Sequence, residues 1–159
     1  TCALPSEYYA KLRGAEQELH LDDKPTLEAF KQLVEFTFDW HQTHAEGVRL
    51  VMVENIHRGK HVNSLPEFES LNSTAIELVR SIYDRGVLEG VMRPNLRPID
   101  IYITIASASF FNVSNRYTFK AIFAHDISTP EEIALRCDAV TDTVLRYVAV
   151  DPGSAAGKI

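Results

Sequence analysis

The amino-acid sequence predicts an all-α fold, a helical bundle of six to seven helices, from three observations. Apolar residues recur at helical spacing in almost every segment, no segment makes a convincing strand, and most glycines fall at expected helix ends. A length of 159 residues suits one domain with one hydrophobic core. We therefore assign residues 1–150 to a single domain and the low-complexity stretch at residues 151–159 to a flexible tail.

Three helices are predicted in the first half of the chain. The first covers about residues 7–19, and the second follows the acidic turn at residues 22–25, in which Pro25 suits a first helical turn because it lacks an N–H. The second helix ends near His44 and carries a broad apolar stripe. The third, at about residues 46–57, is apolar nearly all round, so we expect it to lie inside the bundle.

Two longer helices and a shorter one follow before the last helix. They are predicted at about residues 71–89, 99–112 and 115–124. Gly90 follows the first of these at the position where a left-handed cap favours a residue without Cβ. The second is the most apolar element, and its length and its Ala106-Ser107-Ala108-Ser109 stretch favour a buried helix over a strand.

The last predicted helix has the clearest start in the chain. Ser128 and Thr129 offer N-cap side chains, and Pro130 suits the first turn. Glu131 and Glu132 stand at capping-box spacing from those two residues. Apolar residues then repeat at steps of four, three, four and four, which predicts one stripe facing the core: Ile133, Cys137, Val140, Val144 and Val148.

Composition and charge argue against several classes of protein. No apolar run approaches the roughly 18 residues needed to span a bilayer, and the N-terminus has neither the basic nor the apolar region of a signal peptide. Cys2 and Cys137 stand far apart, which argues against a disulfide scaffold and favours a reducing cytoplasm. The net charge of −6 and the lack of clustered basic residues indicate that this chain alone binds nucleic acid poorly.

Three segments of the chain carry a resemblance to a known family. They are VRLVMVENIHRG at residues 48–59, RGVLEGVMRP at residues 85–94 and SNRYTFKAIF at residues 114–123. In this order they resemble the C-terminal domains of TetR-family transcriptional regulators, and the second is similar to a helix-ending RG-x-x-EG-x-x-RP pattern of that family. The resemblance extends over about residues 8–148. It identifies the chain as a TetR-type effector-binding and dimerisation domain.

The resemblance implies a longer parent protein. The family's N-terminal helix-turn-helix head has no counterpart in this sequence, and the chain starts without an initiator Met. We therefore expect operator DNA to be bound only through a missing head, with each head of a dimer reading one half-site in the major groove. The resemblance further implies a cytoplasmic repressor that an unknown small-molecule effector releases from DNA, with no membrane association and no cofactor.

A homodimer built from the last long helices is also implied by the resemblance. The small residues from Ala106 to Ser109 permit close helix approach, and Leu135 and Leu145 lie off the main stripe of the last helix. The alternative is that these two leucines are scattered surface residues, which need no explanation. The expected interface residues are Ala106, Ser109, Leu135, Val140, Val144 and Leu145.

The family fold implies an effector cavity among the second to fifth helices and the short helix. Ligand sites are mostly apolar with a few convergent polar groups, although each aromatic residue could equally belong to an ordinary core. Glu54 and Asn55 are more informative, because a polar group on an apolar helix needs a partner if it is buried; Asn55 could instead face solvent. The expected lining residues are Phe38, His41, Val53, Glu54, His57, Tyr83, Tyr102, Phe110, Asn115 and Phe119.

A metal site is the main alternative. Glu54 and His57 have the Glu-x-x-His spacing of di-iron bundles. His41 precedes His44 by three residues, and His61 follows His57 by four. A di-iron centre needs two such motifs and two further glutamates, and we find one motif. The sequence also lacks a nucleophile elbow and a glycine-rich phosphate loop, so we expect no enzyme, while a purely structural dimerisation module stays open.

Overall fold

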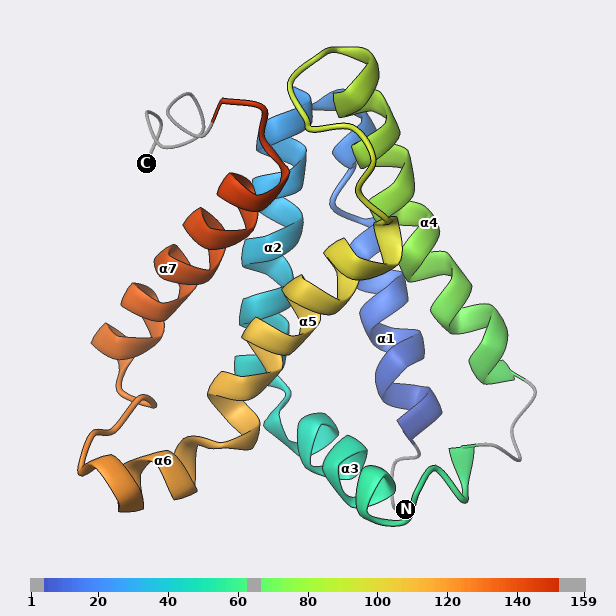
Figure 1. The fold of residues 1–159 in the computed structure, drawn as a ribbon. Helices are drawn as coiled ribbons and strands as arrows, with labels where there is room; N and C mark the ends of the chain where they lie inside the picture. Colours follow the sequence, from blue (N-terminus) through green and yellow to red (C-terminus); the bar gives the residue numbers. More distant parts are fainter. Residues whose placement is uncertain (1–4, 63–66, 152–159) are drawn as a thin grey trace.

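The computed structural model describes residues 5–62 and 67–151 and shows an all-helical bundle (Figure 1). Within these ranges the only β-contact is an isolated bridge between Met92 and Ala149. The predicted fold class is therefore confirmed, whereas residues 152–159 of the predicted tail lie outside the described residues. The elements are α1 (Pro5–Gln17), the 3-10 helix η1 (Leu21–Asp23), α2 (Thr26–Thr43), α3 (Ala45–Ile56), α4 (Glu67–Leu88), α5 (Pro98–Ser114), α6 (Arg116–Phe123) and α7 (Pro130–Val148).

Helix α2 lies at the centre of the bundle and contacts α1, α3, α4, α5 and α7. α5 packs on α2 and also contacts α3, α4, α6 and α7, while α1 packs on α4 and α3. Figure 1 shows α3 and α6 at one end of the bundle, with the α4–α5 connection and the end of α7 at the other. In the described part of the chain, no helix combines the length and the apolar character needed to cross a membrane.

The hydrophobic core lies between α2, α4, α5 and α7. Phe30 and Phe38 of α2 are fully buried, as the predicted stripe requires. Val140, Val144 and Val148 of α7 are also buried, which confirms the predicted repeat of that helix. Each buried side chain of this kind contributes about 1.5–3 kcal/mol. The buried faces of α2 and α7 therefore contribute much of the free energy that stabilises the bundle.

The start of α7 agrees with its prediction from the sequence, whereas the start of α2 differs from its prediction by one position. Thr129 is the N-cap of α7, where its Oγ1 accepts a hydrogen bond from the N–H of Glu132 at 3.3 Å, and Pro130 follows in the first turn. Both features are as predicted. Pro25 instead precedes α2 as its N-cap residue, with an extended ψ of 138°, so its predicted place in the first turn is wrong by one position.

The segment after α4 ties the end of α7 to α4. Gly90 has a φ of 72°, in the left-handed region that favours glycine, which confirms the predicted cap. The N–H of Arg93 then donates to the Val148 carbonyl at 2.8 Å, and the Arg93 guanidinium contacts the Tyr147 carbonyl and lies 5.4 Å from the ring centroid of Tyr147. The family-like segment at residues 85–94 therefore has a structural role at this end of the bundle.

Arg85, at the start of that segment, joins the end of α4 to the start of α2. Its Nε donates to Thr26 Oγ1 at 2.9 Å. Its Nη1 and Nη2 donate to the backbone carbonyls of Asp22 and Leu21 at 2.8 and 3.2 Å. The guanidinium thus satisfies carbonyl groups of η1, which lie next to the chain reversal between α1 and α2.

Helix α3 does not lie inside the bundle, so the burial predicted from its apolar sequence is wrong. Val53 is 51% exposed and Ile56 is 76% exposed. The helix lies at one end of the bundle (Figure 1) and packs there against α1, α2 and α5. An apolar circumference therefore does not identify a buried helix when no element covers its outer side.

Helix α5 is buried on one face only. Ile105 and Ser109 are buried against the core, whereas Ile103 is 53% exposed and Phe111 is 44% exposed. The expected helix is present over the predicted range, and its outer face carries apolar side chains at its surface. This outer face borders the site described below.

Candidate ligand-binding cavity

A cavity of about 290 Å³ lies where α1, α2, α3 and α5 converge. Its volume falls near the lower end of the usual range for small-molecule sites, roughly 300–1,000 Å³. Ile103, Ser107 and Asn55 are exposed, so the cavity opens to solvent between α5 and α3. The lining residues are Tyr9, Leu12, Arg13, Thr37, His41, Val51, Asn55, Tyr102, Ile103, Ala106, Ser107 and Phe110.

Helical spacing explains why these side chains meet. The five lining residues of α5 fall at positions i, i+1, i+4, i+5 and i+8, which form one face of a helix. The pairs contributed by α2 and α3 are each separated by four residues, so both members of a pair point the same way. α1 adds Tyr9, Leu12 and Arg13 at i, i+3 and i+4. One face of each of these four helices thus lines the cavity.

Arg13 is the charged side chain of the cavity wall, and it is only 6% exposed. Its Nη1 lies 2.7 Å from Oε2 of Glu16, which is 5% exposed and three residues along α1. Burial raises the pKa of Glu16 to about 7, although the positive charge of Arg13 opposes that shift. Near neutral pH the Glu16 carboxyl is therefore partly protonated, while the Arg13 guanidinium stays charged.

His41 faces the cavity from α2 as a neutral imidazole. Burial lowers its pKa to about 4, and the positive charges of Arg13 and His44 act in the same direction. The Tyr8 hydroxyl lies 2.6 Å from His41 Nδ1, within hydrogen-bond distance, and burial raises the pKa of that hydroxyl, so the hydroxyl stays protonated. If Nδ1 accepts this hydrogen bond, the neutral imidazole carries its proton on Nε2, and if Nδ1 donates, the proton is on Nδ1.

Two phenols complete the polar part of the wall. Burial raises the pKa of Tyr9 to about 12 and also raises that of Tyr102, while the Arg13 charge opposes both shifts. Both hydroxyls therefore stay neutral under physiological conditions and serve as donors or acceptors. The lining thus combines one permanent positive charge with neutral hydroxyls, a neutral imidazole and apolar surface.

Of the predicted ligand contacts, His41, Tyr102 and Phe110 line the cavity. Phe38 and Tyr83 lie in the hydrophobic core instead. Phe38 is fully buried, and the Tyr83 hydroxyl donates to the Arg93 carbonyl at 2.8 Å. Their aromatic character indicated burial correctly, but sequence periodicity does not distinguish a solid core from the wall of a cavity.

Val53, His57, Asn115 and Phe119 also lie away from the cavity. Val53 and His57 are exposed at the outer side and end of α3. The Asn115 side-chain amide donates to Ser114 Oγ at 2.7 Å, and Phe119 belongs to an aromatic cluster on α6. α3 and α6 lie at one end of the bundle (Figure 1), and none of these four residues is among those that line the cavity.

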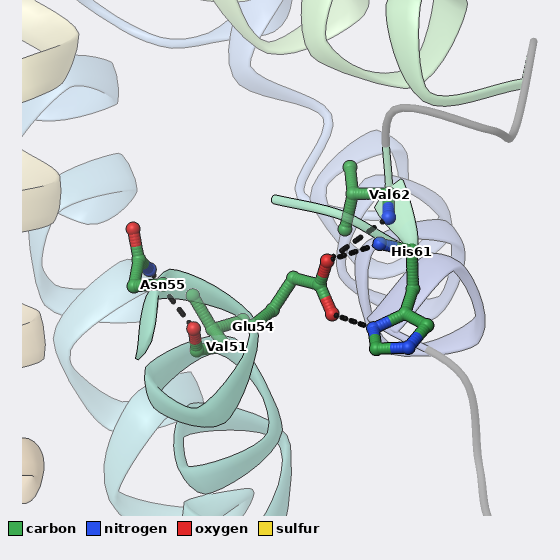
Figure 2. Close-up of polar contacts among 5 residues, drawn as sticks. All are labelled: Val51, Glu54, Asn55, His61 and Val62. Atoms are coloured by element: carbon green, nitrogen blue, oxygen red, sulfur yellow. Dashed lines mark hydrogen bonds and ion pairs between the residues drawn. The ribbon is translucent and has the colours of Figure 1, made fainter. Parts of the chain in front are cut away.

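Glu54 holds the loop after α3, and its side chain points away from the side on which Asn55 lies (Figure 2). Its Oε1 accepts hydrogen bonds from the N–H groups of His61 and Val62 at 2.7 and 3.1 Å, and its Oε2 lies 3.0 Å from His61 Nδ1. Burial raises the pKa of Glu54, but these hydrogen bonds outweigh it and hold the pKa below its usual value. Asn55, at the cavity rim, donates to the Val51 carbonyl at 2.9 Å.

The histidines of the metal-site alternative do not converge on one site. His44 stacks on Trp40 with ring centroids 3.8 Å apart, and the rings of His57 and His61 stand edge to face at 5.9 Å. Across residues 5–62 and 67–151, no group of three or more His, Cys, Asp or Glu side chains could hold a metal ion.

The residues expected at a dimer interface lie in different places. α7 packs on both α2 and α5, which buries a broad arc of the helix inside the subunit. Three expected interface residues are 3% exposed or less in the subunit's own core, which corrects their assignment: Val140, Val144 and Leu145. Ser109 is also fully buried, and Ala106 lines the cavity. Leu135 is 62% exposed and stays available for association.

The cavity residues of α1 were missed at the level of sequence. A signal was present, because Tyr9, Leu12, Arg13 and Glu16 fall at i, i+3, i+4 and i+7 on one helical face. Two opposite charges on that face indicate a buried pair, since a buried charge needs a partner. Arg13 and Glu16 are therefore the residues from which this part of the site could have been found.

The structure is an all-helical bundle with a cavity near the size of small-molecule sites, which is the architecture of a ligand-binding domain. Residues 27–144 match the family model described as "Tetracyclin repressor-like, C-terminal domain". The chain therefore belongs to the TetR family of transcriptional regulators.

One curated relative agrees with that assignment. The chain is 30% identical over 138 residues to the HTH-type transcriptional repressor NicS of Pseudomonas putida. The matched region covers 87% of this chain and 65% of the relative. The chain thus spans just under two thirds of the length of NicS.

Proposed function

We propose that this chain senses a small-molecule effector for a TetR-type repressor, and that the effector relieves DNA binding by a helix-turn-helix head. The observation that carries the proposal is the cavity, in which Arg13, Thr37 and His41 converge on an apolar and aromatic wall. A purely structural module predicts a filled interior here, so the cavity favours sensing. The description of NicS as an HTH-type repressor supports the link to DNA.

Relief of DNA binding requires that the effector prefer one arrangement of the helices over another. α1 is suited to transmit that preference, because it contributes three lining side chains and packs on α2, α3 and α4. An effector that fits one position of α1 better shifts the population toward it. Coupling is reciprocal, so operator DNA weakens effector binding by the same factor.

The second part of the proposal is a homodimer. One subunit leaves several large apolar side chains exposed along α5, α6 and α7, and exposed apolar surface of this kind marks sites of association. Of the interface residues expected on α7, Leu135 is exposed, and the proposed contact combines it with exposed apolar residues that the sequence did not single out. These exposed residues are Phe111, Tyr117, Ile122, Phe123 and Leu135.

The cavity is tested by screening the 159-residue chain against a library of small neutral, anionic and cationic molecules with a thermal-shift assay. Ala106 lines the cavity, so Ala106→Trp fills it, and we expect every true ligand to lose at least about tenfold in affinity. Ala10→Trp places the same side chain on the exposed surface of α1 and serves as the control.

The link to transcription is tested with the full-length protein. Ligands that bind the cavity are expected to weaken operator binding, measured by fluorescence anisotropy of labelled DNA. The sensing role would be contradicted if no library member bound the chain, or if the ligands found bound Ala106→Trp as tightly as the unaltered chain.

A further inference from the structure

The charge of the cavity wall restricts the chemistry of its ligand. Arg13 is the one Lys or Arg among the lining residues described, and no Asp or Glu lines the cavity with it. Glu16 pairs with the buried guanidinium at 2.7 Å, and no carboxylate of the described part of the chain accompanies Arg13 on the cavity side. A ligand that carries a negative charge is therefore matched to this wall, and one that carries a positive charge is opposed by it.

Glu16 does not occupy the side of Arg13 that faces the cavity. A second void of about 10 Å³ lies beside the pair, and Glu16 lines that void, whereas the large cavity is lined by Arg13 without Glu16. A guanidinium has five N–H donors, and one carboxylate engages at most two of them side by side. The Tyr102 phenol engages one further donor of Arg13, and the remaining N–H groups on the cavity side are available to a second anion.

The surroundings of Glu16 allow its carboxylate to take up a proton and become neutral. Among the described residues, two ionisable groups face Glu16: the charged guanidinium of Arg13 and the phenol of Tyr102. Burial favours the neutral form of Glu16, so an anion that arrives beside Arg13 is balanced by proton uptake at Glu16. The other described side chains around the small void do not ionise: Leu33, Thr37, Ala75, Leu78, Val79 and Ile105.

The rest of the wall fits a flat ring. Tyr9, Tyr102, His41 and Phe110 border the cavity, and the rings of His41 and Phe110 meet edge to face at 5.8 Å. Aromatic side chains favour stacked or edge-to-face contact with another ring. The volume of about 290 Å³ limits such a ligand to a small molecule.

We propose that the effector is a small aromatic carboxylate, with its carboxylate paired to Arg13 and its ring held between the aromatic side chains of α1, α2 and α5. This inference rests on the proposed sensing function, because it names the class of effector for the same cavity.

The test compares probes that share a ring and differ in charge. Isothermal titration calorimetry on the 159-residue chain would use benzoate, benzamide and benzylamine, and then 2-naphthoate with its amide and its methylamine analogue. We expect at least one carboxylate to bind about tenfold or more tightly than its amide, since hydrogen bonds to a charged partner are the stronger ones. The amines should bind least.

Two variants assign the preference to the proposed groups. Arg13→Gln is expected to weaken carboxylate binding about tenfold to hundredfold and to leave amide binding nearly unchanged. Arg80→Gln removes an arginine from the exposed surface of α4 and serves as the control.

Glu16→Gln keeps Arg13 and removes the competing carboxylate, so the readout does not depend on how well Arg13→Gln folds. In the unaltered chain, carboxylate affinity is expected to fall as the pH rises through about 7, because ionised Glu16 then holds Arg13. In Glu16→Gln this pH dependence is lost, and the affinity at pH above 7 increases.

The outcomes separate this inference from the function on which it rests. Tighter binding of carboxylates that depends on Arg13 supports it. If amides or amines bind the cavity as well as carboxylates do, the anion preference is overturned while the sensing role stands. If no probe and no library member binds, both fail.

Discussion

At the scale of single residues, Gly47 shows how a residue outside the cavity positions its wall. A Cβ at this position would overlap the ring of Tyr8, so only glycine lets α1 and α3 approach this closely. Tyr8 in turn holds His41 through the 2.6 Å contact between its hydroxyl and Nδ1. The orientation of one cavity residue therefore depends on the absence of a side chain on a neighbouring helix.

Gly47→Ala is expected to destabilise the domain by about 1–3 kcal/mol, because the added methyl forces Tyr8 out of its place. Urea unfolding followed by circular dichroism measures the change. Gly14→Ala is the matched control, since a Cβ on this residue of α1 meets no atom within 4 Å. That variant should gain about 0.5–1 kcal/mol from helix propensity alone. Equal effects of the two substitutions would contradict the contact.

His41 predicts how stability responds to acid. Its folded-state pKa of about 4 lies below the ordinary 6.5, so the unfolded chain binds more protons between these values. Stability is therefore fully present above about pH 6.5 and falls as the pH drops toward 4, by about 3 kcal/mol at most for this one group.

The acid response is measured as the unfolding free energy at a series of pH values. His41→Gln should remove the loss of stability that His41 causes between pH 6.5 and 4, which leaves the opposite contribution of Glu16 in place, whereas the same change at exposed His57 is the matched control. An unaltered slope in His41→Gln would show that His41 is not the group that titrates.

The sequence predicts part of the cavity wall correctly and misplaces Leu145, and each outcome has a physical reason. His41, Tyr102 and Phe110 could be predicted to line the cavity, because large side chains on the inner faces of α2 and α5 must meet. Leu145 was expected at an interface and lies in the core, since α7 is covered by two helices and buries more than one stripe. Such coverage depends on tertiary contacts, which helical spacing alone does not contain.

At the scale of elements, the segment after α4 determines how three helices join. Arg85 donates to carbonyls of η1 and to Thr26 at the start of α2, while Arg93 contacts the last turn of α7. The sequence pattern that carries the family resemblance thus coincides with contacts between distant segments. These contacts give the segment a structural role, and none of its residues is among those that line the cavity.

Arg85→Ala is expected to cost about 1.5–3 kcal/mol, the usual range for hydrogen bonds that involve a charged group. Thermal unfolding would show the loss, and ligand affinity in the cavity should stay the same because Arg85 lies outside it. Arg80→Ala lies on the same helix in an exposed ion pair with Glu77 and should change stability by well under about 1 kcal/mol. A loss no larger than that of Arg80→Ala would contradict the joining role.

The extent and order of the helices could be predicted from the sequence, but which neighbouring helices cover each of them could not. Caps such as Thr129 and Gly90 are local signals, and the structure places both where the spacing predicts. α3 was expected inside because its residues are apolar, yet burial depends on which elements surround a helix. The position of α3 at the end of the bundle therefore had to come from the structure.

At the scale of the whole molecule, the proposed dimer makes a direct prediction about mass. Multi-angle light scattering of the chain, whose mass is 17.9 kDa, should give about twice that value at micromolar concentration. Leu135→Lys places a charge in the proposed contact and is expected to shift the protein toward the monomer.

The control for this prediction is Leu88→Lys. Leu88 is 89% exposed at the end of α4, away from the helices proposed to associate, so its substitution should leave the mass unchanged. A monomer in the unaltered protein would overturn the proposed dimer, and dissociation by both variants would show that the effect is not specific to α7.

The chain contains one tryptophan, Trp40, and its surroundings give the protein a built-in optical reporter. The indole stacks on His44, and its ring centroid lies 6.4 Å from that of Tyr8, the side chain that contacts His41 at the cavity wall. A guest that shifts His41 changes the environment of a single fluorophore. Intrinsic emission can therefore follow occupancy in real time, in unlabelled protein and without a coupled assay.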